Sequence, residues 1–261
     1  MARLQSRCSQ SPTPQIAKHL LITGASGALG RALALYHAGP DTVLSLWGRN
    51  EVRLADTAEA ARTAGAEASE RSLDLTDCDA AVAALVAEDS ETAFDVVYLV
   101  AGIGDVCPAD ALVEPPEQVA RMVQTNFTAP AAMATAIAQR MAERGRGRIV
   151  IIGSAAGHHA LPSAASYAAS KAGLAHFADA LRIAMKPHGV SVVLVAPGFI
   201  ASGANKRPMA IPVEVAARRI AQAAERGKRH YVTPWPFTAL RLLEKLLPTF
   251  LRDRVLAALK P

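Results

Sequence analysis

The chain has 261 residues, a length that one α/β domain can fill, and we expect a single domain. Hydrophobic residues make up 51% and charged residues 20% of the sequence, near the averages for globular proteins, which argues against disorder in its body. The net charge of +5 comes from scattered basic residues without an aromatic-studded basic strand, so we expect no nucleic acid partner and favour an anionic small ligand.

The beginning of the chain and the cysteines bear on its location. Residues 1–18 contain basic side chains but no apolar segment of a signal peptide, and we expect a flexible lead-in there. No apolar run approaches the ~18 residues that cross a bilayer. Cys8, Cys78 and Cys107 show no metal-ligand spacing, and their odd number argues against a disulfide framework. We therefore predict a cytoplasmic chain with reduced thiols and no metal site.

From residue 19 onwards, short β-branched or Leu-rich runs alternate with longer Ala-rich helical stretches. This pattern predicts an α/β fold, a single doubly wound Rossmann-type domain over 19–234 with a mostly parallel seven-stranded sheet flanked by helices. The expected strands are 19–23, 42–47, 68–74, 95–100, 147–153, 190–195 and 230–233. The expected helices are 28–38, 50–65, 76–89, 116–144, 164–187 and 213–227. Ligands bind such sheets beyond the carboxyl ends of the strands, so functional residues should lie there.

A glycine-rich turn, TGASGALG at 23–30, follows the first strand and leads into a helix. Glycines let the backbone approach a pyrophosphate, which then sits at the positive N-terminal end of the helix. A tight turn without a ligand is the alternative, but the order of strand, glycines and helix favours phosphate binding. The cofactor-binding residues expected here are Gly24, Ser26, Gly27, Ala28, Leu29 and Gly30.

The ends of the second and third strands bear on the type of dinucleotide. The second strand lacks the acidic residue that would bind the ribose of NAD. Gly48 leaves room there and Arg49 can pair with a 2′-phosphate, which favours NADP(H) over NAD(H), although a solvated surface arginine is the alternative. Asp74, beside Leu75, could accept a hydrogen bond from the adenine amino group. Capping of the helix that begins near Thr76 is equally consistent with the sequence.

The candidate catalytic residues come from three segments. Tyr167 and Lys171 lie four residues apart at the start of an Ala-rich helix and share one face, and a nearby ammonium lowers the pKa of a tyrosine from its ordinary ~10. Ser154 closes the fifth strand, where its hydroxyl can bond a substrate oxygen while Tyr167 delivers the proton. Asn126 lies within the expected helix 116–144, an unfavourable place unless its amide has a partner, and a packing role is the alternative.

Residues 19–202 resemble the short-chain dehydrogenase/reductase family, in its compact single-domain branch. The shared features are TGASGALG, the spacing of Ser154, Tyr167 and Lys171, Asn126, and Pro197-Gly198 after the sixth strand. The resemblance implies that Tyr167 is the general acid or base and that Ser154 steadies the substrate oxygen. It implies that Lys171 holds the nicotinamide ribose and lowers the pKa of Tyr167, while Asn126 holds a water in a proton relay. It also implies cofactor contacts from Ala101, Gly102, Tyr167, Lys171, Pro197, Gly198, Ile200 and Ser202.

Two features depart from the family pattern. The glycine spacing is that of the larger extended branch, with Ala28 where the compact branch usually has its middle glycine. The usual Asn-Asn-Ala-Gly after the fourth strand is Leu99-Val100-Ala101-Gly102. Because both asparagines are missing, the support that they give the central sheet must come from elsewhere.

Two further segments carry open expectations. His158 and His159 lie between Ser154 and Tyr167, a substrate-lining region by the resemblance, without further ligands for a metal. Residues 235–261 form an amphipathic helical extension that we expect to pack on the domain or on a partner, with contact to a membrane surface as the less favoured alternative. The resemblance also implies a homodimer or homotetramer.

The sequence therefore predicts an NADP(H)-dependent oxidoreductase that interconverts an alcohol and a ketone or aldehyde. A non-catalytic NADP(H)-sensing regulatory protein is the alternative, and the intact catalytic set argues against it because a sensor needs no proton donor. Sugar epimerisation or dehydration, suggested by the glycine spacing, is less favoured since no sugar-nucleotide domain follows.

Overall fold

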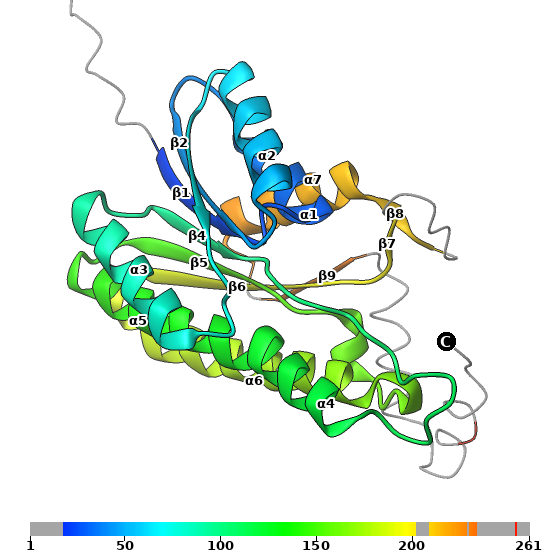
Figure 1. Cartoon of the computed structure of the whole chain (residues 1–261). Coiled ribbons are helices and arrows are strands. Elements are labelled where there is room, and N and C mark those ends of the chain that lie inside the picture. Colours follow the sequence, from blue (N-terminus) through cyan, green and yellow to red (C-terminus); the bar gives the residue numbers. More distant parts are fainter. Residues whose placement is uncertain (1–17, 202–208, 229, 234–253, 255–261) are drawn as a thin grey trace, which may run out of the picture.

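Helices and strands alternate along the chain in the computed structural model, which describes residues 18–201, 209–228, 230–233 and 254 (Figure 1). The strands are β1 (Lys18–Thr23), β2 (Thr42–Gly48), β3 (Glu67–Ser72), β4 (Val96–Leu99), β5 (Gly147–Ile152), β6 (Val190–Pro197), β7 (Ile200–Ala201), β8 (Ile211–Pro212) and β9 (His230–Thr233). The longer helices are α1 (Ala28–His37), α2 (Glu51–Thr63), α3 (Cys78–Glu91), α4 (Pro116–Val123), α5 (Ala129–Glu143), α6 (Ala165–Met185) and α7 (Val213–Glu225).

Seven strands form one parallel sheet in the order β3-β2-β1-β4-β5-β6-β9. The chain builds outward from β1 to β3 and then returns to place β4 on the other side of β1. This reversal is the topological switch point at which doubly wound folds bind ligands. Helices α1, α2 and α7 cover one face, and α3, α5 and α6 cover the other (Figure 1). The expected fold class, a doubly wound Rossmann-type α/β domain, is confirmed.

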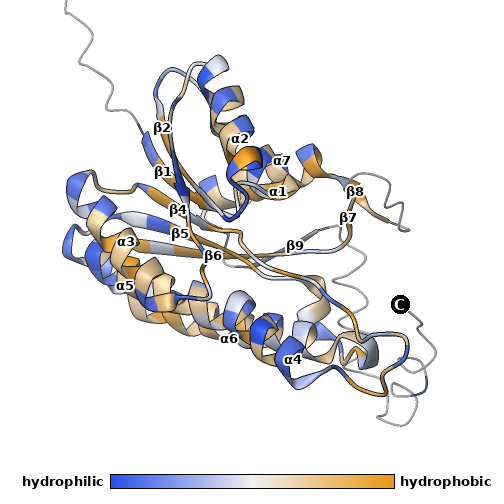
Figure 2. Ribbon diagram, in the orientation of Figure 1, coloured by the Kyte–Doolittle hydropathy of each residue, from blue (hydrophilic) through white to orange (hydrophobic). Residues whose placement is uncertain are grey.

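The central strands of the sheet are apolar on both faces, and helices cover both faces (Figure 2). Side chains alternate between the faces along each strand: in β4, Val96 and Tyr98 join one buried cluster, while Val97 and Leu99 join the other. All four are 2% exposed or less, so this strand lies in the centre of the core. The burial of β4 fixes the position of the loop that follows it.

The prediction of one continuous helix over 116–144 is wrong. This segment is divided into α4, a π-helical turn over Gln124–Thr128, and α5. Pro130, at the start of α5, has no N–H to donate to the carbonyl of Asn126 four residues earlier, so regular hydrogen bonding cannot run through this point. The π turn places Asn126 in the interior, where it is 0% exposed.

Other element ends shift by one or two residues. Lys18 belongs to β1, where it pairs with Thr42, so the lead-in expected over 1–18 does not include it. Strand β3 ends at Ser72, and Asp74 therefore follows the strand instead of closing it. Ser202, residues 1–17 and the extension 235–261 apart from Arg254 lie outside the described residues. In the part of the chain that is described, no helix is both long enough and apolar enough to cross a membrane.

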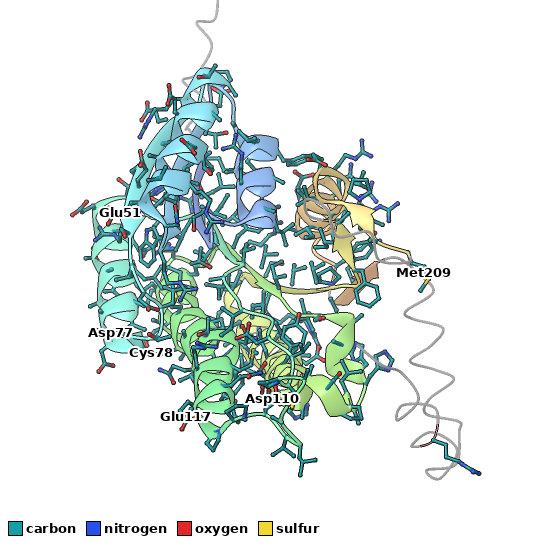
Figure 3. All side chains as sticks on the ribbon, turned by 45° about the vertical axis from the view of Figure 1, so that its right-hand side comes forward. Glu51, Asp77, Cys78, Asp110, Glu117 and Met209 are labelled. Carbon is teal, nitrogen blue, oxygen red and sulfur yellow. The ribbon has the colours of Figure 1, made fainter. Side chains whose placement is uncertain are left out.

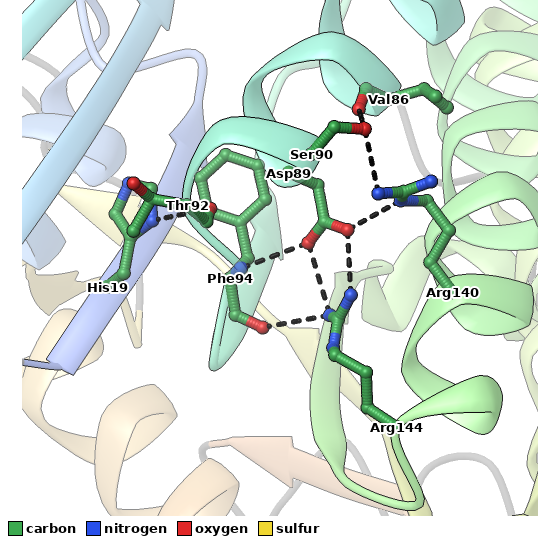
Figure 4. Close-up of polar contacts among 8 residues, drawn as sticks. All are labelled: His19, Val86, Asp89, Ser90, Thr92, Phe94, Arg140 and Arg144. Atoms are coloured by element: carbon green, nitrogen blue, oxygen red, sulfur yellow. Dashed lines mark hydrogen bonds and ion pairs between the residues drawn. The ribbon is translucent and has the colours of Figure 1, made fainter.

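A buried ionic cluster lies at the amino ends of β4 and β5 (Figure 4). The carboxylate of Asp89, at the end of α3, accepts hydrogen bonds from Arg140 at 2.5 Å and from Arg144 at 2.7 and 3.1 Å. It also accepts the backbone N–H of Phe94 at 3.0 Å. These contacts join α3 to α5 and fix the turn that leads into β4.

Candidate active site

A cavity of about 350 Å³ lies beyond the carboxyl ends of β1, β2 and β4. The glycine turn forms one wall, which contains Gly24, Ser26, Gly27, Ala28, Leu29 and Gly30. Gly24 has a φ of +70°, and a Cβ there would lie 2.9 Å from the Cα of Ala101. A Cβ on Gly30 would lie 2.3 Å from the carbonyl oxygen of Gly24. These two glycines therefore let the turn approach both the loop after β4 and helix α1.

The first backbone N–H groups of α1 face this turn and lack a capping side chain. Gly27 occupies the N-cap position, offers no side-chain acceptor, and is followed by no acidic residue in the first turn. The first N–H groups of a helix need acceptors and carry a partial positive charge. This end of α1 can therefore hold an anion.

The ends of β2 and β3 form the second wall of the cavity. Its residues are Trp47 and Gly48 at the end of β2, Arg49 in the turn that follows, and Arg53 on α2. Arg49 is exposed, and a Cβ on Gly48 would lie 2.6 Å from the Oγ of Ser26, so β2 and the glycine turn are in close contact. The wall therefore presents two arginines beside the glycine turn.

Asp74 and Leu75 also line the cavity. The carboxylate of exposed Asp74 accepts the N–H of Thr76 at 3.0 Å, and this bond, with the charge of Arg49, holds the pKa of Asp74 below its usual value. Helix α3 is capped instead by Asp77, whose carboxylate accepts the N–H of Ala80 at 3.0 Å. The alternative that Asp74 caps this helix is therefore wrong.

Thr23 and Asn126 hold the loop after β4. The Oγ1 of Thr23 accepts the N–H groups of Val100 at 3.0 Å and Ala101 at 3.2 Å. Asn126 pairs with both backbone groups of Ile103, accepting its N–H at 2.9 Å and donating to its carbonyl at 2.8 Å. These bonds supply the support that the missing asparagines would give.

Ala101 and Gly102 line the cavity at the start of this loop. A Cβ on Gly102 would lie 3.4 Å from the Nζ of Lys171, and one on Gly104 would lie 3.7 Å from the ring of Tyr167. The loop after β4 therefore lines the cavity on one side and packs against the first turns of α6 on the other. The predicted cofactor residues at the sheet switch point and the predicted catalytic residues are neighbours.

Tyr167, Lys171 and Ser154 meet at the end of β5. Lys171 is 5% exposed, its Nζ donates to the carbonyl of Ile152 at 3.0 Å, and burial lowers its pKa to about 8. Burial raises the pKa of Tyr167, and a side-chain hydrogen bond with Ser154 opposes this shift. The expected lowering of the Tyr167 pKa is therefore wrong for the protein alone, because desolvation of the phenolate outweighs the favourable contacts.

Five described residues that are predicted to contact the cofactor do not line this cavity: Tyr167, Lys171, Pro197, Gly198 and Ile200. Pro197 ends β6, Gly198 follows it, and Ile200 begins the short strand β7, all at the carboxyl edge of the sheet. Ser202 lies outside the described residues.

Several cavity residues were missed in the sequence: Trp47, Arg53, Leu73, Val100, Ile103 and Thr125. Arg53 carries a signal that could have found it, since it lies four residues after Arg49. Thr125 has a stronger structural signal. It is 6% exposed, and its Oγ1 finds no hydrogen-bond partner among the described residues. A buried hydroxyl without a partner in a cavity wall is a candidate ligand contact.

A second, open hollow of about 590 Å³ lies between the loop after β5 and one face of α6. Small and apolar residues from the loop after β5 and from α6 form most of its lining, with His158 and His159 among them. Among the described residues, no three His, Cys, Asp or Glu side chains are placed to hold a metal ion together. The hollow can therefore accept an apolar group, although Tyr167 is not among the residues that line it.

Comparison with known proteins places these features in a family. The sequence model of short chain dehydrogenases matches residues 18–210. An uncharacterized oxidoreductase from Myxococcus xanthus is 35% identical over 239 residues, which cover 89% of this chain and 94% of the relative. An uncharacterized oxidoreductase, Rv2073c, from Mycobacterium tuberculosis is 34% identical, with 88% and 92% covered. A metagenomic short-chain oxidoreductase, solved in complex with NADP, superposes with a TM-score of 0.70 at 27% identity, covering 80% of this chain and 91% of that one.

Proposed function

The chain belongs to the short-chain dehydrogenase/reductase family, and we propose that it is an NADP(H)-dependent oxidoreductase that interconverts an alcohol and a ketone or aldehyde. One observation carries this proposal: half-buried Tyr167 has a side-chain hydrogen bond with Ser154, lies one helical turn before buried Lys171, and is next to the loop that lines the cavity at the glycine turn. A proton donor is thus adjacent to a site that suits a hydride carrier.

The cavity fits a dinucleotide in three respects. The uncapped N-terminus of α1 can hold a pyrophosphate, while Gly24 and Gly30 keep side chains away from it. Thr125 offers a buried hydroxyl without a partner in the described structure. A nicotinamide cofactor held in this cavity would supply or accept the hydride. Pro197, Gly198, Ile200 and Ser202 are proposed to lie along it, and Ala101 and Gly102 to contact it from the loop after β4.

The proton step follows from the environment of Tyr167. Its raised pKa keeps the phenol protonated near neutral pH, which suits donation to a carbonyl oxygen during reduction. Ser154 would hold that oxygen through its hydroxyl. Lys171, with a pKa of about 8, still carries its charge in most molecules at pH 7 and would stabilise the phenolate as the proton leaves. Asn126 acts in this scheme mainly by holding Ile103 and the loop.

NADP(H) is proposed over NAD(H) because of charge at the end of β2. Arg49 and Arg53 both line the cavity, and the only nearby carboxylate in its lining is Asp74. A guanidinium can pair with a 2′-phosphate in a bidentate manner. The metagenomic relative, which was solved with NADP, is consistent with this preference.

The substrate is proposed to lie near the loop after β5, which carries Ser154, His158 and His159. We also propose a cytoplasmic location, a homodimer or homotetramer, and a helical extension over 235–261 that packs on the domain or on a partner.

A substrate screen with a Tyr167→Phe variant tests the proposed function. Oxidation of NADPH and NADH is followed against a panel of aldehydes, ketones, steroids and quinones. Tyr167→Phe should retain the Kd for NADPH within about twofold and lower kcat by about 10²–10⁴-fold, the range for loss of a general acid. Tyr36→Phe is the matched control, since Tyr36 is 39% exposed on α1, and it should leave kcat unchanged. NADPH binding without turnover of any compound would favour the sensor; unchanged turnover in Tyr167→Phe would exclude the assigned proton donor.

A further inference from the structure

Helix α6 carries both Tyr167 and Lys171, yet it begins without a capping side chain of its own. Its N-cap residue is Ala164, and its first turn contains no acidic residue. The first N–H groups of a helix lack partners within the helix and need acceptors from elsewhere. For a helix that positions a proton donor in its first turn, the source of those acceptors decides where the donor lies.

Glu114 supplies the acceptors from a segment 52 residues earlier in the chain. One carboxylate oxygen accepts the backbone N–H of Ser166 at 2.7 Å, and the other accepts the Ser166 hydroxyl at 2.7 Å. Glu114 is 9% exposed, so these bonds are shielded from water. A carboxylate at the positive end of a helix gains from the helix dipole and from charge-assisted hydrogen bonds. Ser166 directly precedes Tyr167.

Glu114 is itself held at the end of the loop that joins β4 to α4. The side-chain amide of Gln118 donates to Glu114 at 3.3 Å and to the carbonyl of Val106 at 3.1 Å. The N–H of Cys107 donates to the carbonyl of Ser163 at 2.7 Å, a second bond between this loop and the segment before α6. Figure 1 shows the loop passing from β4 toward the end of the molecule where α4 and the start of α6 lie.

The two ends of this loop contact the two parts of the site. At its start, Ile103 lines the cavity and is held by Asn126. At its end, Glu114 holds the residue before Tyr167. We propose that Glu114 is a positioning residue that aligns the Tyr167 hydroxyl with the cofactor cavity by fastening the first turn of α6 to the loop after β4. This inference rests on the proposed function, since it concerns the same proton donor.

Three variants and one control test the proposal in the full-length protein. Glu114→Gln keeps one acceptor for the two Ser166 donors, Ser166→Ala removes the hydroxyl donor, and the double variant combines them. Glu117→Gln is the control, because Glu117 is exposed on the outer side of α4, three residues along the chain (Figure 3). The measurements are the melting temperature, the Kd for NADPH by fluorescence titration, and kcat per NADPH-binding site.

Glu114→Gln should lower kcat per binding site by about 10- to 100-fold, the scale for a reacting group displaced by about 1 Å. The Kd for NADPH should stay within about twofold, and Glu117→Gln should match the wild type. The effect of Ser166→Ala should be smaller in the Glu114→Gln background than in the wild type, because the two side chains share one contact. A purely structural cap would lower the melting temperature alone, and an unchanged kcat per binding site would overturn the proposal.

Hydrogen exchange separates this proposal from the proposed function. The amides in the first turn of α6 should exchange faster in Glu114→Gln than in the wild type, whether or not a substrate is found. Unchanged exchange overturns the positioning role. Faster exchange in a protein that binds NADPH but turns over no carbonyl or alcohol overturns the proposed function and reduces the role of Glu114 to a helix cap.

Discussion

Two buried charged groups at opposite edges of the sheet differ in how the fold compensates them. At the amino edge, Asp89 has a fully buried side chain that two arginines and a backbone N–H surround (Figure 4). At the carboxyl edge, Lys171 is 5% exposed and donates to one carbonyl, that of Ile152. Both groups are desolvated, but their pKa values respond differently: the arginines hold that of Asp89 below its usual value in spite of burial, while burial lowers that of Lys171 to about 8.

This difference teaches where stability and function lie in the molecule. A buried charge with a full set of partners stabilises the folded state relative to any variant that breaks the set. A buried charge without an opposite charge destabilises the fold and has a shifted pKa, as is common where chemistry occurs. The amino edge should therefore carry stability and the carboxyl edge activity, and three variants can break or sharpen this contrast.

Asp89→Ala should give the largest loss of stability. It leaves Arg140, Arg144 and the N–H of Phe94 without their shared acceptor, which should lower the free energy of unfolding by about 3 kcal/mol. Chemical denaturation measures this loss. Glu91→Gln, an exposed change near the end of the same helix, should stay within about 0.5 kcal/mol of the wild type. If kcat per NADPH-binding site fell as far as stability did, the separation between the edges would not hold.

Lys171→Met should raise the free energy of unfolding at neutral pH, in contrast to Asp89→Ala, and should abolish turnover. Below pH 8 both folded and unfolded wild type carry the Lys171 proton, and the folded state bears the full cost of the buried charge. From about 8 to 10.5 the unfolded chain binds more protons, so wild-type stability rises with pH. The stability of the variant relative to the wild type should therefore decline by up to about 3 kcal/mol between pH 7 and 10.5.

Denaturation at a series of pH values checks this trend. Lys186→Met is the control, since Lys186 is exposed just beyond α6, and its difference from the wild type should not depend on pH in the same way. A pH-independent difference for Lys171→Met would mean that Lys171 is not an uncompensated buried charge.

Arg49→Ala should give the smallest effect, which should be confined to cofactor affinity. Arg49 is exposed, and removing its charge should raise the Kd for NADPH by about tenfold through lost charged hydrogen bonds, while that for NADH should change less than twofold. Arg146→Ala, an exposed arginine before β5 at the amino edge, is the matched control and should change neither value. Equal weakening of both dinucleotides by Arg49→Ala would contradict a 2′-phosphate contact.

Local sequence patterns predicted the fold and most of the cavity wall. Buried parallel strands are continuous apolar runs, and a glycine turn between strand and helix has few other geometries open to it, so residues 23–30 were placed correctly. The π turn at Gln124–Thr128 was not predicted, although Pro130 is the residue that cannot extend a regular helix through Asn126. The apolar spacing on both sides of Pro130 fits one continuous helix, so the break was not predicted.

Contacts between distant segments were beyond local patterns. The sequence offered Asp74 as a helix cap, whereas the chain has a second Asx residue at Asp77 that fits the true start of α3. The direction of the pKa shift of Tyr167 depends on how far its ring is desolvated, and the spacing to Lys171 does not reveal this. Glu114 was not singled out either, because its partner Ser166 lies 52 residues away.

The bond between Thr23 and Val100 has a consequence for biosynthesis. The two residues are 77 positions apart, so a nascent chain that has already produced the glycine turn must wait for β4 before that turn is anchored. Pairing of distant parallel strands is slow and leaves strand edges open during translation. A ligand of this turn would therefore stabilise only chains whose synthesis has passed well beyond β4.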